Sequence, residues 1–128
     1  MIIDEPILRI GVVGPCAAGK STLIHHLELA GVKARHIAQE HSYVLDMWKR
    51  LTNPDILIFL DVSYPMSIRR RNLNWTVEEY LEQQRRLGHA RSYANLYLMT
   101  DPLNQVEVLT AVLEFISIHS QNPENKLR

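Results

Sequence analysis

The segment GPCAAGKS at residues 14–21 constrains the fold of this chain more than any other part of the sequence. It has the spacing G-x-x-x-x-G-K-[ST] and lies between an apolar run at residues 7–13 and an amphipathic stretch at residues 20–30. Its two glycines permit a tight loop whose backbone N–H groups point inward and form a concave site for phosphate oxygens. The sequence therefore predicts a buried strand, an anion-binding loop and a helix over residues 7–30.

Individual positions of this loop have distinct chemical roles in the predicted site. The positive N-terminal end of the helix adds to the attraction for an anion. Lys20 can reach the β- and γ-phosphates of a nucleotide, and the Ser21 hydroxyl can ligate Mg²⁺. Cys16 is interpreted as a small filler, with a reactive thiol as the alternative. A glycine turn that only caps the helix is the alternative for the whole loop. The predicted nucleotide-binding residues are Gly14, Pro15, Cys16, Ala17, Ala18, Gly19, Lys20, Ser21 and Thr22.

Strand and helix patterns alternate along the rest of the chain. Three more strands are predicted, at residues 32–38, 55–61 and 94–99. The first of these is expected at a sheet edge, because charged residues interrupt it. Four more helices are predicted, over residues 42–53, 63–71, 76–88 and 101–116. Since strands that alternate with helices form right-handed crossovers, we expect a three-layer α/β/α fold with a mostly parallel sheet of four or five strands.

Length and composition bound the class of protein. The 128 residues are the size of one domain, predicted as residues 1–118 with a frayed polar tail at residues 119–128. Fourteen Lys and Arg balance fourteen Asp and Glu, so a general attraction to nucleic acid or acidic lipid is not expected. The longest apolar run, residues 56–60, is too short to span a membrane, and a single cysteine with an acidic first segment favours the cytoplasm. The oligomeric state stays open, with a homo-oligomer as one option.

Two acidic residues follow predicted strands and are candidates for catalysis. Asp61 ends the run at residues 55–61, so it would face the same crevice as the loop and hold a Mg²⁺-bound water. Glu40 follows the run at residues 32–38, beside His41, and would serve as a metal ligand or as the base for an acceptor hydroxyl. The alternatives are a strand-end turn residue for Asp61 and a solvated loop acid for Glu40.

Arginines are concentrated between residues 69 and 91. Guanidinium groups stabilise the negative charge that spreads over the transferred phosphoryl oxygens. This cluster therefore predicts a mobile lid, with Arg70 and Arg85 as the catalytic candidates. Solvated helix faces are the alternative for any single arginine.

The histidines and the cysteine predict no zinc site. The six histidines do not show the spacing H-E-x-x-H, and a lone cysteine excludes zinc-finger patterns. His25 and His26 are interpreted as surface or partly packed residues of the first helix.

Taken in order, three segments resemble the P-loop kinases that phosphorylate nucleosides, nucleotides and small metabolites. Residues 14–21 match the phosphate-binding loop of that family. PDILIFLDVSYPMSIRRR, at residues 54–71, is similar to its fourth strand and the helix that leads into the arginine lid. NLYLMTDPLNQVEVLTAVLEFI, at residues 95–116, is similar to its last strand and helix. The resemblance implies ATP as the donor, with GTP as the other option, Mg²⁺ as the cofactor, a small hydroxyl or phosphate acceptor, and a nucleotide base beside residues 100–102.

The chain departs from that family in one respect. Such kinases usually have a further parallel strand that ends in a catalytic acid, and a helical insert that binds the acceptor. Here only residues 41–54 separate the second predicted strand from the third. Either Asp61 and Glu40 take over the role of the acid, which gives a minimal phosphotransferase, or the protein is a nucleotide-binding module or slow NTPase with a regulatory role. A regulatory GTPase is less favoured, because the sequence has no D-x-x-G or N-K-x-D element.

Overall fold

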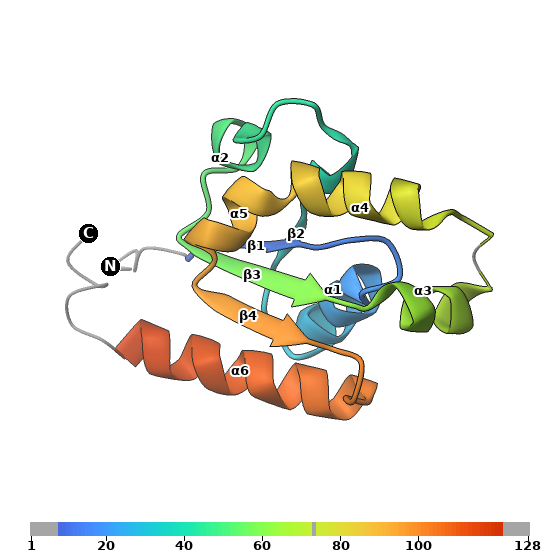
Figure 1. Cartoon of the computed structure of the whole chain (residues 1–128). Helices are drawn as coiled ribbons and strands as arrows, with labels where there is room; N and C mark the ends of the chain where they lie inside the picture. The colour runs from blue at the N-terminus through green and yellow to red at the C-terminus, as the bar shows by residue number, and fades with distance from the viewer. Residues whose placement is uncertain (1–7, 73, 122–128) are drawn as a thin grey trace, which may run out of the picture.

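A four-stranded, all-parallel sheet forms the middle layer of the molecule (Figure 1). This computed structural model describes residues 8–72 and 74–121. In sheet order the strands are β2 (Arg35–His36), β1 (Ile10–Val13), β3 (Ile56–Asp61) and β4 (Leu96–Met99). The helices are α1 (Lys20–Leu29), η1 (Gln39–His41, a short 3-10 helix), α2 (Met47–Leu51), α3 (Tyr64–Arg71), α4 (Val77–Arg86), α5 (Gly88–Tyr93) and α6 (Gln105–Gln121). The predicted α/β class and the parallel sheet of four strands are confirmed.

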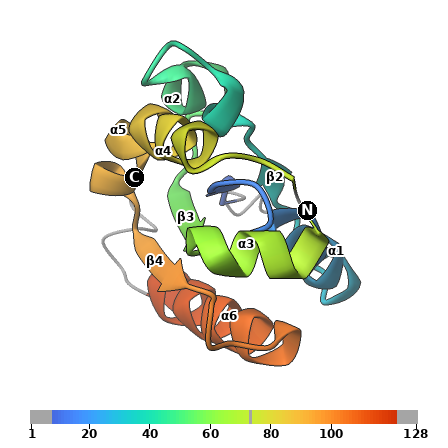
Figure 2. The same ribbon diagram turned by 45° about the vertical axis from the view of Figure 1, so that its right-hand side comes forward.

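Both faces of the sheet are buried at its two central strands, β1 and β3, which consist almost wholly of apolar residues whose side chains alternate between the faces. One cluster joins one face to α1 and α6, and its buried members include Ile10, Val12, Leu23, Leu27, Ile56, Ile58, Leu60, Val108 and Val112. The other cluster joins the opposite face to α2 and the α4–α5 junction, and its buried members are Val13, Ile37, Trp48, Leu57, Phe59, Leu87 and Ala90. Figure 2 shows α6 on one side of the sheet and α2, α4 and α5 on the other. This arrangement is compatible with the predicted three layers.

The strand β2 lies at a sheet edge as predicted, but it is shorter than residues 32–38. The first residues of the predicted strand belong instead to the C-terminal end of α1. Gly31 has a positive φ of 83°, and the N–H of Val32 donates to the carbonyl of Leu27 at 2.8 Å. This hydrogen bond closes the last turn of the helix, so the chain becomes a strand only at Arg35.

Three predicted helices differ from the structure, and the last of them, expected at residues 101–116, begins only at Gln105. Residues 42–53 form only the short helix α2, because the Ser42 hydroxyl accepts a hydrogen bond from the N–H of Val44 at 3.1 Å and makes a local turn instead of a helix cap. The helix predicted over residues 76–88 is expected to end at Gly88. Instead α5 begins there, since Gly88 does not adopt a positive φ and Ala90 packs, fully buried, against β3. Tertiary packing therefore overrides the stop signal of the glycine.

The C-terminal helix α6 continues to Gln121, so the first residues of the expected tail at 119–128 are helical. Residues 122–128 lie outside the described part of the chain. Within the described residues, no helix combines the length and apolar character needed to cross a membrane.

Candidate functional site

A pocket of about 770 Å³ opens at the carboxyl ends of the parallel strands. The segment that follows β1, residues 16–19, and the first turn of α1 form one wall. The other walls come from the ends of β2 and η1, from α3, and from the turn that leads from β4 into α6. The residues that follow the strands are thereby gathered around a single space, as expected for a parallel sheet with helical crossovers.

Glycine is required at the start of the loop because β3 approaches it closely. A Cβ atom on Gly14 would overlap the carbonyl oxygen of Leu60. Ala17 and Gly19 have left-handed backbone conformations, with φ of 70° and 102°, and the N–H of Ala18 donates to the carbonyl of Pro15 at 3.2 Å. These turns wrap the loop tightly onto the start of α1.

The loop ends in a row of unused hydrogen-bond donors. The backbone N–H groups of residues 19–22 donate to no acceptor within residues 8–72 and 74–121, while the N–H of Leu23 makes the first bond of the helix, to Gly19 at 3.0 Å. Gly19 also has no side chain to cover its N–H. Free donors at the positive end of a helix of ten residues attract an anion.

The ammonium group of Lys20 is buried behind the loop. Its Nζ atom donates to Glu40 Oε2 at 2.8 Å, to the carbonyl of Pro15 at 3.2 Å and to the carbonyl of Gly14. Lys20 and Glu40 are only 6% and 2% exposed. Glu40 is therefore not the solvated loop acid of the alternative interpretation. Lys20 is held by a carboxylate, and the pocket of about 770 Å³ opens beside it.

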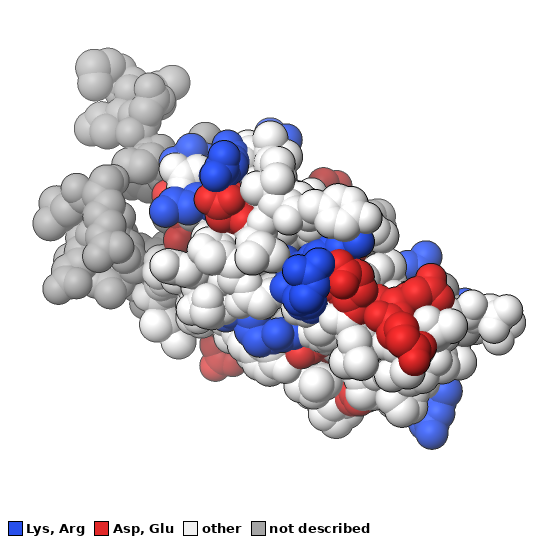
Figure 3. Space-filling model, turned by 45° about the horizontal axis from the view of Figure 1, so that its top comes forward, with Lys and Arg blue, Asp and Glu red and all other residues white. Residues whose placement is uncertain are grey.

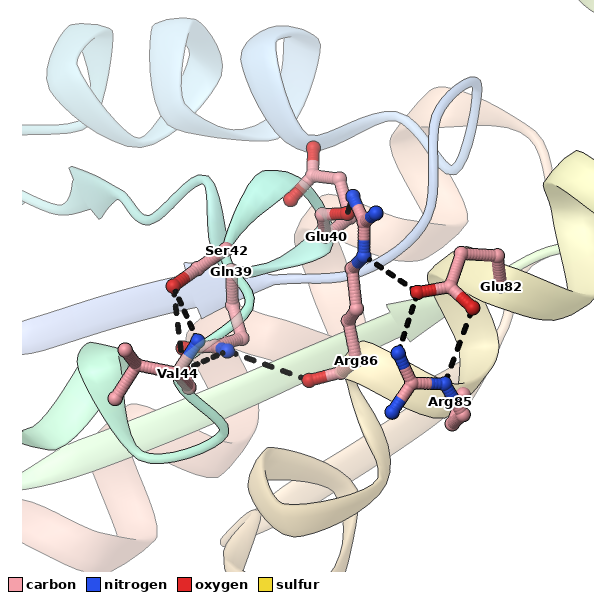
Figure 4. A network of polar contacts seen from close by, with 7 residues as sticks. All are labelled: Gln39, Glu40, Ser42, Val44, Glu82, Arg85 and Arg86. Atoms are coloured by element: carbon pink, nitrogen blue, oxygen red, sulfur yellow. Dashed lines mark hydrogen bonds and ion pairs between the residues drawn. The ribbon is translucent and has the colours of Figure 1, made fainter.

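Glu40 is positioned by a polar network that joins η1 to the segment after it and to α4 (Figure 4). Gln39 Nε2 donates to the carbonyl of Val44 at 2.8 Å and to that of Arg86 at 3.3 Å. Arg86 Nη1 donates to the backbone carbonyl of Glu40 at 3.3 Å, and the Arg86 guanidinium lies 4.3 Å from the centre of the Tyr43 ring. One carboxylate oxygen of Glu40, Oε1, is buried and has no hydrogen-bond partner among the described residues.

Asp61 lies at the end of β3 as predicted, but its side chain does not line the pocket. Its Oδ1 atom accepts from the N–H of Val62 and from Gln84 Nε2, both at 2.9 Å, and its Oδ2 atom accepts from the Tyr97 hydroxyl at 2.6 Å. Arg91 lies 3.7 Å from Oδ2. Burial and the hydrogen bond to Asp61 raise the pKa of Tyr97 to about 12. The carboxylate is thus fully engaged with β4, α4 and α5.

The two arginines named as catalytic candidates occupy different places. Arg70 lines the pocket with Arg71, and its Nη1 atom donates to Thr100 Oγ1 at 2.7 Å and to the carbonyl of Ala17 at 3.4 Å. Arg85 lies outside the pocket, where it pairs with Glu82 at 2.6 Å and its side chain is 61% exposed. On the face of the molecule drawn in Figure 3, basic and acidic side chains lie next to one another and do not form one broad basic patch.

The structure thus brings some predicted residues together and separates others. The segment from Cys16 to Thr22 lines the pocket with Glu40 and Arg70, whereas Gly14, Pro15, Asp61 and Arg85 do not.

Sequence reasoning missed His36, whose pKa is lowered by burial and by the charge of Lys20. It placed Thr100 beside the base but did not foresee that Thr100 accepts from Arg70 and donates to the carbonyl of Asp61 at 2.8 Å. It also missed Gln83, which lies 67 positions from Cys16 and makes two hydrogen bonds with it. No spacing rule links residues so far apart in the sequence.

Comparison of the chain with protein-family models, with curated proteins and with solved structures finds no significant match. The interpretation of the pocket therefore depends on its own geometry and chemistry.

Proposed function

We propose that this chain is a reduced P-loop protein that binds a nucleoside triphosphate in the pocket and transfers its γ-phosphate to a small acceptor. The observation that carries the proposal is the row of free N–H donors at residues 19–22, which opens into a pocket that Arg70 and Arg71 also line. Convergent N–H and guanidinium donors suit a polyphosphate better than any neutral ligand. ATP is the preferred donor and GTP the alternative. A cytoplasmic location belongs to the same proposal.

Binding would change the partner of Lys20. Phosphate oxygens at the loop compete with Glu40 for the ammonium, and a polyphosphate carries more negative charge than one carboxylate. When Lys20 moves to the phosphates, Oε2 of Glu40 becomes free to orient the hydroxyl of an acceptor. His36 and His41 line the same end of the pocket, so this end, between β2 and η1, is where we place the acceptor.

The opposite end of the pocket suits a nucleotide base. Leu103 and Val108 are apolar there, and Asn104 and Gln105 carry amides that can both donate and accept hydrogen bonds. This end follows residues 100–102, where the resemblance to P-loop kinases places the base. The pocket is continuous, so one nucleotide can contact the start of α6 and the loop together.

Mg²⁺ fits only part of the predicted ligand set. Mg²⁺ requires hard oxygen ligands, and the exposed Ser21 hydroxyl on the pocket wall can supply one. Asp61 does not fit, because both of its oxygens already accept hydrogen bonds. We therefore assign the ion to Ser21 and to the phosphates, where it would neutralise phosphate charge, and we leave Asp61 to position β4 and α4.

The second candidate is a nucleotide-binding module or slow NTPase that has no small acceptor. It is favoured because neither candidate acid is free to act as a base. Glu40 is paired with Lys20, and Asp61 does not line the pocket, so Glu40 is the only acid among the described residues that do.

Calorimetric titration with ATP or GTP and Mg²⁺ tests nucleotide binding, which both candidate functions require. We expect saturable binding that is lost in Lys20→Ala and kept in Lys33→Ala, an exposed lysine outside the pocket. An absence of nucleotide binding in the unaltered chain would refute both candidates.

A screen of nucleosides, nucleotides and small alcohols then separates the two candidates. Acceptor-stimulated release of ADP supports the phosphotransferase. Turnover that no acceptor stimulates, or binding without turnover, supports the module.

A further inference from the structure

Three side chains that ligate transition metals meet where the loop faces η1. The Cys16 sulfur, a ring nitrogen of His41 and a carboxylate oxygen of Glu40 all lie within 4.8 Å of one another. In a tetrahedral zinc site, ligand atoms that lie 2.0 to 2.3 Å from the ion are separated by roughly 3.5 Å. Metal binding therefore requires the ligand atoms to move closer together, and His41, whose side chain is 60% exposed, has the most freedom to do so. We infer that Cys16, Glu40 and His41 form a binding site for one Zn²⁺ or a similar divalent transition-metal ion.

An independent observation points to a cation at this place. Glu40 is 2% exposed, and its Oε1 atom has no hydrogen-bond partner among the described residues. Buried carboxylate oxygens are almost always paired, so an orphan oxygen indicates a partner that the protein itself does not supply. Oε2, which accepts from Lys20 at 2.8 Å, lies 3.8 Å from His41 Nε2, so the carboxylate borders both the ammonium and the histidine ring. We assign the metal ion to the unpaired Oε1, which leaves Oε2 paired with Lys20.

Gln83 of α4 orients the Cys16 side chain through two hydrogen bonds. Its Oε1 atom accepts from the backbone N–H of Cys16 at 3.0 Å, and its Nε2 atom donates to the Cys16 sulfur at 3.2 Å. A donor on the sulfur stabilises a thiolate and fixes its direction, as outer-shell partners do in known metal centres. Because Lys20 already compensates the charge of Glu40, the Cys16 thiolate supplies the one uncompensated negative charge that attracts the cation.

The donor set selects the kind of metal. Thiolate and imidazole favour Zn²⁺ or Co²⁺ over Mg²⁺ and Ca²⁺, which prefer oxygen. On binding, the Cys16 thiol loses its proton to solvent as the metal–sulfur bond forms. Three protein ligands leave a fourth position open toward the pocket, where water or an oxygen of a pocket ligand can bind. The site does not depend on nucleotide binding.

Titration of the untagged full chain with Co²⁺, without nucleotide, tests the inference. We expect one equivalent of Co²⁺ to produce the thiolate-to-cobalt charge-transfer band and the visible bands of a tetrahedral ion, and Zn²⁺ to displace it. Cys16→Ser removes the charge-transfer band, and His41→Gln weakens binding by at least about tenfold. Gln83→Leu, which removes only the outer-shell contact, weakens it by roughly 10- to 100-fold.

Controls keep the test independent of folding and of the proposed nucleotide site. His25→Gln alters an exposed histidine outside the pocket, and its affinity for Co²⁺ is expected to equal that of the unaltered chain. Glu40→Asp keeps the charge but retracts the carboxylate, so it weakens metal binding while circular dichroism confirms the fold. The inference is overturned if no charge-transfer band forms, if Cys16→Ser retains it, or if His41→Gln and His25→Gln bind Co²⁺ equally.

Discussion

Lys20 and Glu40 are both almost fully buried, so each depends on the other for compensation of its charge. Removal of one partner from a buried pair leaves an isolated charge in a medium that solvates it poorly. Glu40→Gln is therefore expected to lower the free energy of unfolding by about 3 kcal/mol. The double variant Lys20→Met, Glu40→Gln is expected to recover part of this loss. Urea denaturation of the four proteins of this double-mutant cycle measures both effects.

The exposed pair of Arg85 with Glu82 is the matched control for this prediction. Its charges stay in water, so Arg85→Ala is expected to leave the free energy of unfolding nearly unchanged. Equal losses from Glu40→Gln and Arg85→Ala would contradict the importance given to burial.

The sequence predicted those parts of the candidate site that depend on the local backbone conformation. It did not predict those that depend on contacts between residues far apart in the sequence. The spacing of Gly14, Gly19 and Lys20 places a loop at a helix N-terminus, and the structure has that loop. Asp61 was correctly placed at the end of a strand. Its hydrogen bonds to Tyr97 and Gln84 depend on which elements pack beside β3, and that information is not local.

At the scale of elements, capping signals were correct at the starts of α3 and α4 but wrong at Ser42 and Gly88. The capping box of Thr76 and Glu79 is present at the start of α4, and Ser63 caps α3 by accepting from the N–H of Met66 at 3.3 Å. Local signals did not predict α5, because that helix is stabilised by packing of Leu87 and Ala90 against β3. The cluster of Cys16, Glu40 and His41 was missed for a related reason, since the segments after β1 and β2 come together through the pairing of these strands and not through local sequence.

The contact between β3 and β4 predicts how stability depends on pH. Tyr97 of β4 stacks on Phe59, and its pKa rises from an ordinary 10 to about 12 in the folded protein. Because the folded state holds the phenolic proton more tightly than the unfolded state, this contribution is complete below pH 10 and is lost as the pH rises toward 12. Tyr97→Phe is expected to flatten the alkaline fall in the free energy of unfolding. Denaturation at several pH values between 9 and 12 measures the slope.

A matched comparison is Tyr93→Phe, which alters an exposed tyrosine of α5. Its profile is expected to follow that of the unaltered chain. If both variants flatten the curve equally, Asp61 and Tyr97 do not account for the pH dependence.

At the scale of the whole molecule, the pocket joins both edges of the sheet. It extends from β2 and η1 to the turn between β4 and α6, across the carboxyl ends of β1 and β3. The sequence predicted a crevice at this edge, because parallel strands end on the same side. The extent of the pocket depends on how far η1 and α6 stand apart, which no local pattern encodes.

A single nucleotide that contacts both ends of the pocket should protect segments far apart in the sequence. With ATP and Mg²⁺, we expect slower amide hydrogen exchange at residues 19–22, whose N–H groups become hydrogen bonded, and at residues 39–41 and 103–105. The helix α5, which packs on the other face of β3 away from the pocket, should exchange at an unchanged rate. Lys20→Ala should show none of these changes. Protection spread evenly over the chain, α5 included, would indicate general stabilisation and would argue against binding at this pocket, because a ligand held there contacts only the segments that line it.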